Sequence, residues 1–60
     1  MKVDISRKQN VVAITIQLSP LRKLTYETRD SLSTQIEHER DLRAMTPEDI
    51  YRYVISEFVS

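Results

Sequence analysis

The segment VVAITIQLSP, residues 11–20, has the most regular hydropathy pattern in this chain. Its apolar side chains alternate strictly with small or amide-bearing ones: the apolar set is Val12, Ile14, Ile16 and Leu18, and the other set is Val11, Ala13, Thr15 and Gln17. A period of two residues predicts a β-strand with one buried face and one open face. The buried face requires a core, whereas the open face can be solvated or can contact a partner.

Residues 2–8 show a weaker form of the same alternation. If they fold back on residues 11–18 through a two-residue loop, Ile5 lies opposite Ile14 and the apolar faces of the two strands coincide. A slip of one residue would mismatch every pair, so this agreement predicts a β-hairpin. A flexible arm over residues 1–10 is the alternative.

The chain contains no glycine, so its tight turns must be made by asparagine and other polar residues. Between the two strands we expect positive φ at Asn10, because Gln9 incurs a larger steric cost there. A chain that can make few tight turns is expected to have few elements.

Ser19 and Pro20 have the residue types that begin a helix, a capping hydroxyl followed by proline at the first helical position. The residues that follow place apolar or threonine side chains at spacings of three and four, namely Leu21, Leu24, Thr28, Leu32 and Ile36. This spacing predicts a helix over about residues 20–41. The first part of this segment is rich in β-forming residues, so a third strand within residues 20–30 is the alternative.

The last helix has the clearest start signal. Thr46 can cap it, Pro47 suits its first position, and the acidic residues at the next two positions complement the positive end of the helix dipole. One broad side is apolar and comprises Ile50, Tyr51, Val54, Ile55 and Phe58. The pattern predicts an amphipathic helix over residues 47–59. In the charged segment ahead of it, Glu39 and Arg43 are expected to pair one turn apart.

Length and composition predict one small α+β domain over residues 1–60. A chain this short buries only about 60% of the surface that its unfolded form exposes, and this one has no Cys for a disulfide. We therefore expect a homodimer. Nine basic and nine acidic residues balance, so no overall field draws the chain to nucleic acid or to a membrane. The absence of an apolar secretion signal or membrane span predicts a cytoplasmic location.

Residues that could carry catalysis or bind a metal are scarce. His38 is the only histidine, and of its acidic neighbours only Asp41, three residues further on, could share a metal with it on a helix. A lone histidine in a charged run is more often simply solvated. We therefore expect no catalytic residue, no metal site and no cofactor.

Two segments together resemble the ribbon-helix-helix DNA-binding family, the class of the Arc and MetJ repressors. They are the strand ITIQLS, followed by a proline-started helix, and the final helix TPEDIYRYVISEF, within residues 12–20 and 46–58. The local match is to the second helix of Arc, and its residues here are Asp49, Ile50, Tyr51, Arg52, Val54, Ile55 and Phe58.

In that family, two copies of the strand pair across a dimer, and their outward residues read bases in the major groove of double-stranded DNA. The resemblance therefore implies that Ala13, Thr15 and Gln17 face DNA, and the glutamine amide is suited to adenine. It also implies that Thr46, at the start of the last helix, holds a phosphate. Further phosphate contacts are expected from the basic residues Lys2, Arg7, Lys8, Arg22 and Lys23.

The alternative function is a protein-binding module, such as an inhibitor or an accessory factor, built as a β-hairpin packed on one or two helices. The neutral net charge of the chain agrees with this alternative. The pairing of residues 11–18 distinguishes the two hypotheses. Pairing with a second copy favours the regulator, and pairing with residues 2–8 favours the protein-binding module.

Overall fold

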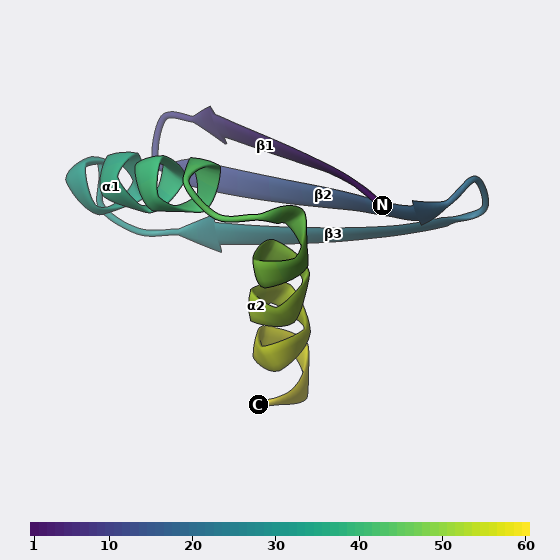
Figure 1. The fold of residues 1–60 in the computed structure, drawn as a ribbon. Helices are drawn as coiled ribbons and strands as arrows, with labels where there is room; N and C mark the ends of the chain where they lie inside the picture. Colours follow the sequence, from purple (N-terminus) through teal and green to yellow (C-terminus); the bar gives the residue numbers. More distant parts are fainter.

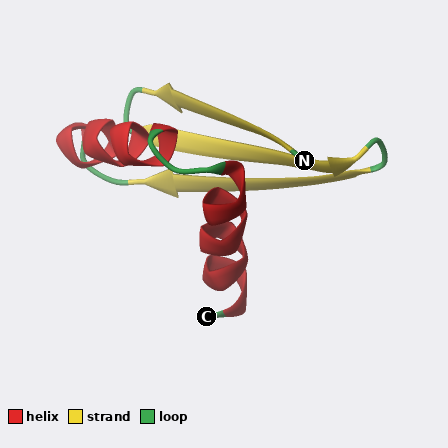
Figure 2. Ribbon diagram, in the orientation of Figure 1, coloured by secondary structure: helices red, strands yellow, loops and turns green.

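A computed structural model describes residues 1–60 and contains three strands followed by two helices. β1 (Lys2–Lys8), β2 (Val11–Ser19) and β3 (Arg22–Arg29) form an antiparallel sheet in the order β1-β2-β3. α1 (Leu32–Arg43) and α2 (Pro47–Val59) both pack on one face of this sheet (Figure 1; Figure 2). The α+β class is as predicted, with one strand more and a shorter first helix.

The β1–β2 hairpin has the register that the alternation predicted. Ile5 pairs with Ile14, and the two-residue loop Gln9–Asn10 joins the strands, so the N-terminal residues are a paired strand and not an arm. Positive φ, 57°, lies at Gln9 and not at Asn10, contrary to the expectation. A two-residue hairpin turn of type II′ needs positive φ only at its first central residue. The Arg7 guanidinium donates to the Gln9 carbonyl at 2.9 Å and supports this conformation.

Residues 22–29 are a strand, the alternative stated for residues 20–30, and not the first turns of the predicted helix. In β3, Leu24 lies opposite Ile16 and Tyr26 opposite Ile14. The prediction was wrong because Leu24 and Thr28, four residues apart, share a face in a helix and also in a strand. Threonine and tyrosine favour the pleated conformation, and β3 pairs the second edge of β2, which a helix would leave open.

The β2–β3 turn accounts for the residues that had been expected to start that helix. Ser19 and Pro20 lie at this turn, and Leu21, predicted to be buried, is 96% exposed at its tip. The cap of α1 is instead Ser31, whose Oγ accepts the Thr34 N–H at 3.3 Å.

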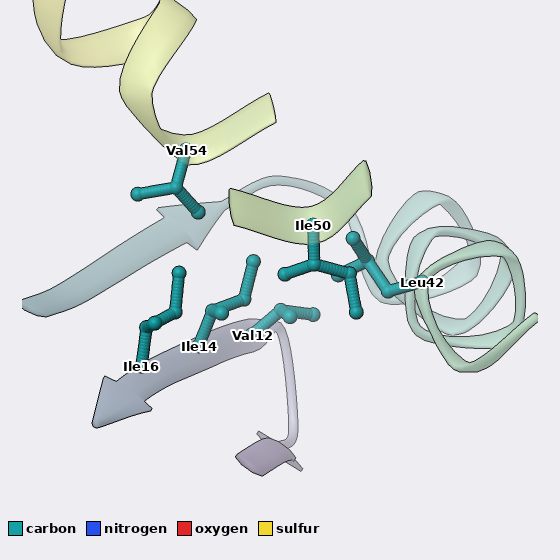
Figure 3. Packing of buried hydrophobic residues seen from close by; sticks show 6 residues of the cluster. All are labelled: Val12, Ile14, Ile16, Leu42, Ile50 and Val54. Atoms are coloured by element: carbon teal, nitrogen blue, oxygen red, sulfur yellow. The ribbon is translucent and has the colours of Figure 1, made fainter. Parts of the chain in front are cut away.

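The core lies between the sheet and the two helices. Figure 3 shows the inward side chains of β2 meeting α2, with one side chain of α1 closing the side; the six buried residues are Val12, Ile14, Ile16, Leu42, Ile50 and Val54. The alternation in β2 is therefore the pattern of a central strand with one covered face, at Val12, Ile14 and Ile16. Leu18, the fourth apolar residue of the alternation, is 36% exposed near the end of the strand, contrary to the expectation.

The start of α2 is as the sequence predicted. Thr46 Oγ accepts the Asp49 N–H at 3.2 Å, and Pro47 occupies the first position. α2 runs across the direction of the strands, and its C-terminal half extends past β3 (Figure 1). Phe58 is consequently 56% exposed although it belongs to the predicted apolar side. Neither helix has the length and apolar character needed to cross a membrane.

Candidate nucleic-acid interface

No helix covers the second face of the sheet, which we call the open face. Its side chains stand in four cross-strand rows, which are Lys8, Val11 and Arg29; Ser6, Ala13 and Glu27; Asp4, Thr15 and Thr25; and Lys2, Gln17 and Lys23. The two middle rows are small or hydroxyl-bearing in their centre, so a partner can approach the sheet closely there.

The cations of the open face lie at its four corners. Lys2 and Lys23 occupy one end and Lys8 and Arg29 the other. The two ends are about 20 Å apart, because each residue of a strand advances the chain by about 3.4 Å. None of these four side chains takes part in the four ion pairs of the chain. With two carboxylates between them, the open face has a net charge of +2.

A shallow hollow of about 470 Å³ marks one end of the open face. Lys8 and Arg29 lie on its two sides, Val11 and Ala13 form its floor, and Glu27 contributes one carboxylate. Two cations beside a floor of small apolar side chains are compatible with a group of delocalised negative charge.

The charges of the chain are divided between its two layers. Residues 1–29, the sheet, contain six Lys and Arg and two Asp and Glu, whereas residues 30–60, the helices, contain three and seven. The sheet therefore has a net charge of +4 and the helical layer −4. The net charge of the whole chain is zero and does not show this division. A separate count over residues 1–29 and residues 30–60 shows it from the sequence alone.

The structure brings most of the predicted site residues together. Ala13, Thr15, Gln17 and Lys8 all lie on the open face, beside the predicted phosphate contacts Lys2 and Lys23. The amide of Gln17 is engaged, because its Nε2 donates to the carbonyls of Ser19 and Arg22. It braces the irregular end of the β2–β3 hairpin and is not free to read a base. Thr25 and Arg29 are additions that come from β3, which the sequence analysis held only as the alternative to a helix.

Arg7 and Thr46 lie elsewhere. Arg7 points to the helical side, where its Nε donates to Glu39 Oε1 at 2.8 Å, and Arg43 pairs with the same carboxylate at 3.0 Å, as predicted for that pair. Hydrogen bonds from Arg7 and then from Arg43 lower the pKa of Glu39. This cluster fastens β1 to α1. Thr46 Oγ is occupied as a helix cap, so neither residue joins the open face.

His38 is half-buried and not solvated as expected. Its Nε2 lies 3.4 Å from the hydroxyl of Tyr53, and the two rings meet edge to face. Burial, followed by the proximity of Tyr26 and Glu57, raises the pKa of Tyr53. The chain contains no group of three or more His, Asp or Glu side chains arranged to hold a metal ion.

β2 is the central strand, so both of its edges are paired within one chain. The ribbon-helix-helix resemblance implies instead that this strand pairs with a second copy. Comparisons of the chain with protein-family models, with characterised proteins and with solved structures found no match.

Proposed function

We propose that this chain is a small non-enzymatic DNA-binding protein, of the kind that regulates transcription, and that it docks its open face on a duplex. The observation that supports this is the set of four cations at the corners of a face that no helix covers. A cation that neutralises a phosphate releases condensed counterions, which is the main source of non-specific affinity for DNA. The corner cations have no ion pair to break, so their full charge is available for phosphates.

The spacing of the corners suits a duplex. The major groove is about 12 Å wide, and the basic ends of the open face are about 20 Å apart along the strands. Strands that cross the groove direction would therefore bring Lys2 and Lys23 to one wall of phosphates and Lys8 and Arg29 to the other. The small side chains between the ends would face the base edges.

This mode differs from the ribbon that the sequence resemblance implies. A flat face of three strands is wider than the two-stranded ribbon that a major groove admits, so it approaches the groove without entering it deeply. With Gln17 engaged in the turn, the hydroxyls of Thr15 and Thr25 are the main groups left for base contacts. We therefore expect binding dominated by phosphates, with weak discrimination between sequences.

The experiment is duplex binding by fluorescence anisotropy over a range of salt concentrations. Four phosphate contacts predict a slope of log K against log[salt] of about −3.6, which weakens binding about 150-fold between about 50 and 200 mM salt. The double variant Lys8→Ala/Arg29→Ala should reduce the magnitude of the slope by about two. The matched control is Arg40→Ala/Arg52→Ala, which removes two exposed cations of the helical layer and should leave the slope unchanged.

If the wild-type chain shows no salt-sensitive binding to any duplex at low ionic strength, or if both double variants change the slope alike, the open face is not a DNA interface.

A protein-binding module is the second candidate, and the closure of the β1–β2 hairpin within one chain favours it. The architecture, a hairpin and a third strand packed on two helices, is close to the one expected for such a module. A protein partner of the open face would give a shallow salt slope, and its affinity would depend more on Val11 than on the corner cations.

A further inference from the structure

β1 and β3 are the two edge strands of the sheet, and both edges of β2 are paired. The outer edge of β1 is partly engaged, since Arg43 Nη2 donates to the Ile5 carbonyl at 3.0 Å. No side chain bonds to the outward backbone groups of β3. An uncovered strand edge is a ready template for pairing with another strand.

The ladder shows which residues of β3 present those groups. The Asp30 N–H donates to the Asn10 carbonyl at 3.4 Å, one step beyond the paired residues Val11 and Arg29. Because backbone groups in an antiparallel ladder point to alternate sides, the even-numbered residues of β3 bond to β2. The odd-numbered residues Lys23, Thr25, Glu27 and Arg29 therefore turn their N–H and C=O groups to the free edge.

We propose that two copies of this chain pair through β3, antiparallel, with the two-fold axis at Thr25. In this register Lys23 lies directly opposite Glu27 of the partner subunit, and the symmetry makes this pair twice. On the inner face, Leu24 lies opposite Tyr26 of the partner subunit. The edge is thus complementary to itself in charge on one face and in apolar character on the other.

Neighbouring registers lack this match. Moving the axis to Tyr26 sets Lys23 opposite Arg29 of the partner subunit, and moving it to Glu27 sets the two Glu27 carboxylates against each other. Like charges directly opposite destabilise a ladder. An axis at Leu24 sets Lys23 opposite a threonine and forms no ion pair, so the register at Thr25 is the favoured one.

α2 supplies a cover for the added strand. Its C-terminal half extends past β3 (Figure 1). The ring centroids of Phe58 and Tyr26 are 5.7 Å apart, and Phe58 is still 56% exposed. Tyr53 faces α1, so the opposite flank of α2, with Tyr51 and Ile55, is directed away from α1. If β3 of a second copy paired along this edge, the C-terminal half of α2 would cover it.

The surface of the single chain also exceeds that of a compact monomer. Its accessible area is 4432 Å², whereas a monomer of 7.1 kDa is expected to expose about 4,100 Å². The radius of gyration of 11.3 Å is likewise larger than the value of about 10.4 Å expected for 60 residues. The overhanging part of α2 is one source of this difference, and pairing through β3 would cover it.

The dimer does not depend on DNA binding. It would join two open faces into one six-stranded surface, and each subunit would keep its net charge of +2 there. Because Lys23 would pair with Glu27 of the partner subunit, the phosphate contacts of each subunit in the dimer would come from Lys2, Lys8 and Arg29.

Single-cysteine variants test the register, since the chain has no cysteine of its own. At the axis, hydrogen-bonded partners lie about 5.5 Å apart between Cα atoms, within the range for a disulfide. Oxidised Thr25→Cys should therefore run as a covalent dimer. Lys23→Cys and Glu27→Cys are the controls, because each would be about 13 Å from its own copy. A monomeric Thr25→Cys variant, or preferential cross-linking of either control, would overturn the proposal.

A charge exchange, measured by sedimentation equilibrium of the full chain, tests the ion pairs. Lys23→Glu should raise the dimer dissociation constant about tenfold, because it turns two attractive pairs into two repulsive ones. Adding Glu27→Lys should return the constant to within about threefold of the wild-type value. Lys2→Glu, which changes the same charge at the other edge of the sheet, should have little effect. A wild-type chain that sediments as a monomer throughout, or a double variant no better than Lys23→Glu, would contradict the pairing.

Discussion

Replacing Ile14 with alanine tests whether the core is centred on β2. Ile14 is 1% exposed and lies between Ile5 and Tyr26, beneath α2 (Figure 3). A buried Ile→Ala change costs about 2–5 kcal/mol, more where the surroundings cannot close on the cavity. Three elements enclose this position, so we expect about 3–5 kcal/mol. That is at least about a third of the stability of such a chain, which at 0.05–0.15 kcal/mol per residue is about 3–9 kcal/mol.

Leu21→Ala is the matched control for Ile14→Ala. The helical spacing placed Leu21 in the core, whereas the structure leaves it 96% exposed at the β2–β3 turn, so the change should stay within about 0.5 kcal/mol. Urea unfolding followed by circular dichroism measures both, and an unchanged m-value shows that the two states are comparable. If Ile14→Ala is too unstable to measure, Ile14→Val should still cost about 0.5–1.5 kcal/mol. A Leu21→Ala cost equal to that of Ile14→Ala would contradict the exposed position of Leu21 and favour a packed helix over residues 20–30.

Three further changes are expected to have smaller effects. Since the pKa of Glu39 is lowered, its contribution to stability should be complete above the usual glutamate value of about 4.3 and lost as pH falls through the lower folded value, and Glu39→Gln should flatten this part of a pH–stability curve. Thr46→Ala should cost about 1 kcal/mol in thermal unfolding by removing the acceptor of the Asp49 N–H. Gln17→Ala should cost about 1 kcal/mol and speed amide exchange at the β2–β3 turn, whereas Thr15→Ala, on the same face, should do neither.

The parts of the fold that the sequence predicted are those that local patterns determine. The alternation around Ile14 and Ile5 allows only one register for the hairpin, because any slip turns one apolar face outward. Thr46 and Pro47 mark the start of α2 through their own backbone requirements. Neither feature depends on how distant segments pack.

The sequence offered a strand within residues 20–30 only as the alternative to a helix, because the structure of β3 depends on its pairing with β2. Leu24 and Thr28 fit a helix and a strand equally, and the free edge of β2 that favours a strand is visible only once the sheet exists. The exposure of Phe58 has a similar origin. It follows from the direction in which α2 crosses the sheet, which the apolar side of the helix does not specify.

The candidate site was predicted in part. Alternation in β2 and β1 placed Ala13, Thr15 and Lys8 on one face, whereas Arg29 joined them only through β3. The opposite charges of the two layers were present in the sequence and required only that the two halves be counted apart. The engagement of Gln17 by the turn depends on side-chain geometry, which no sequence pattern gave.

The most direct test of the proposed function is to map duplex binding on the assigned amide spectrum of the full chain. Titration with a short DNA duplex at low salt should shift the amides of Ala13, Thr15 and Thr25, together with those near Lys8, and should leave Ile50 in the core of the helical side unmoved. Salt added afterwards should reverse these shifts, since phosphate contacts carry the binding. Shifts confined to α1 and α2, or no shifts at any duplex concentration, would contradict the assignment of the open face as a DNA interface.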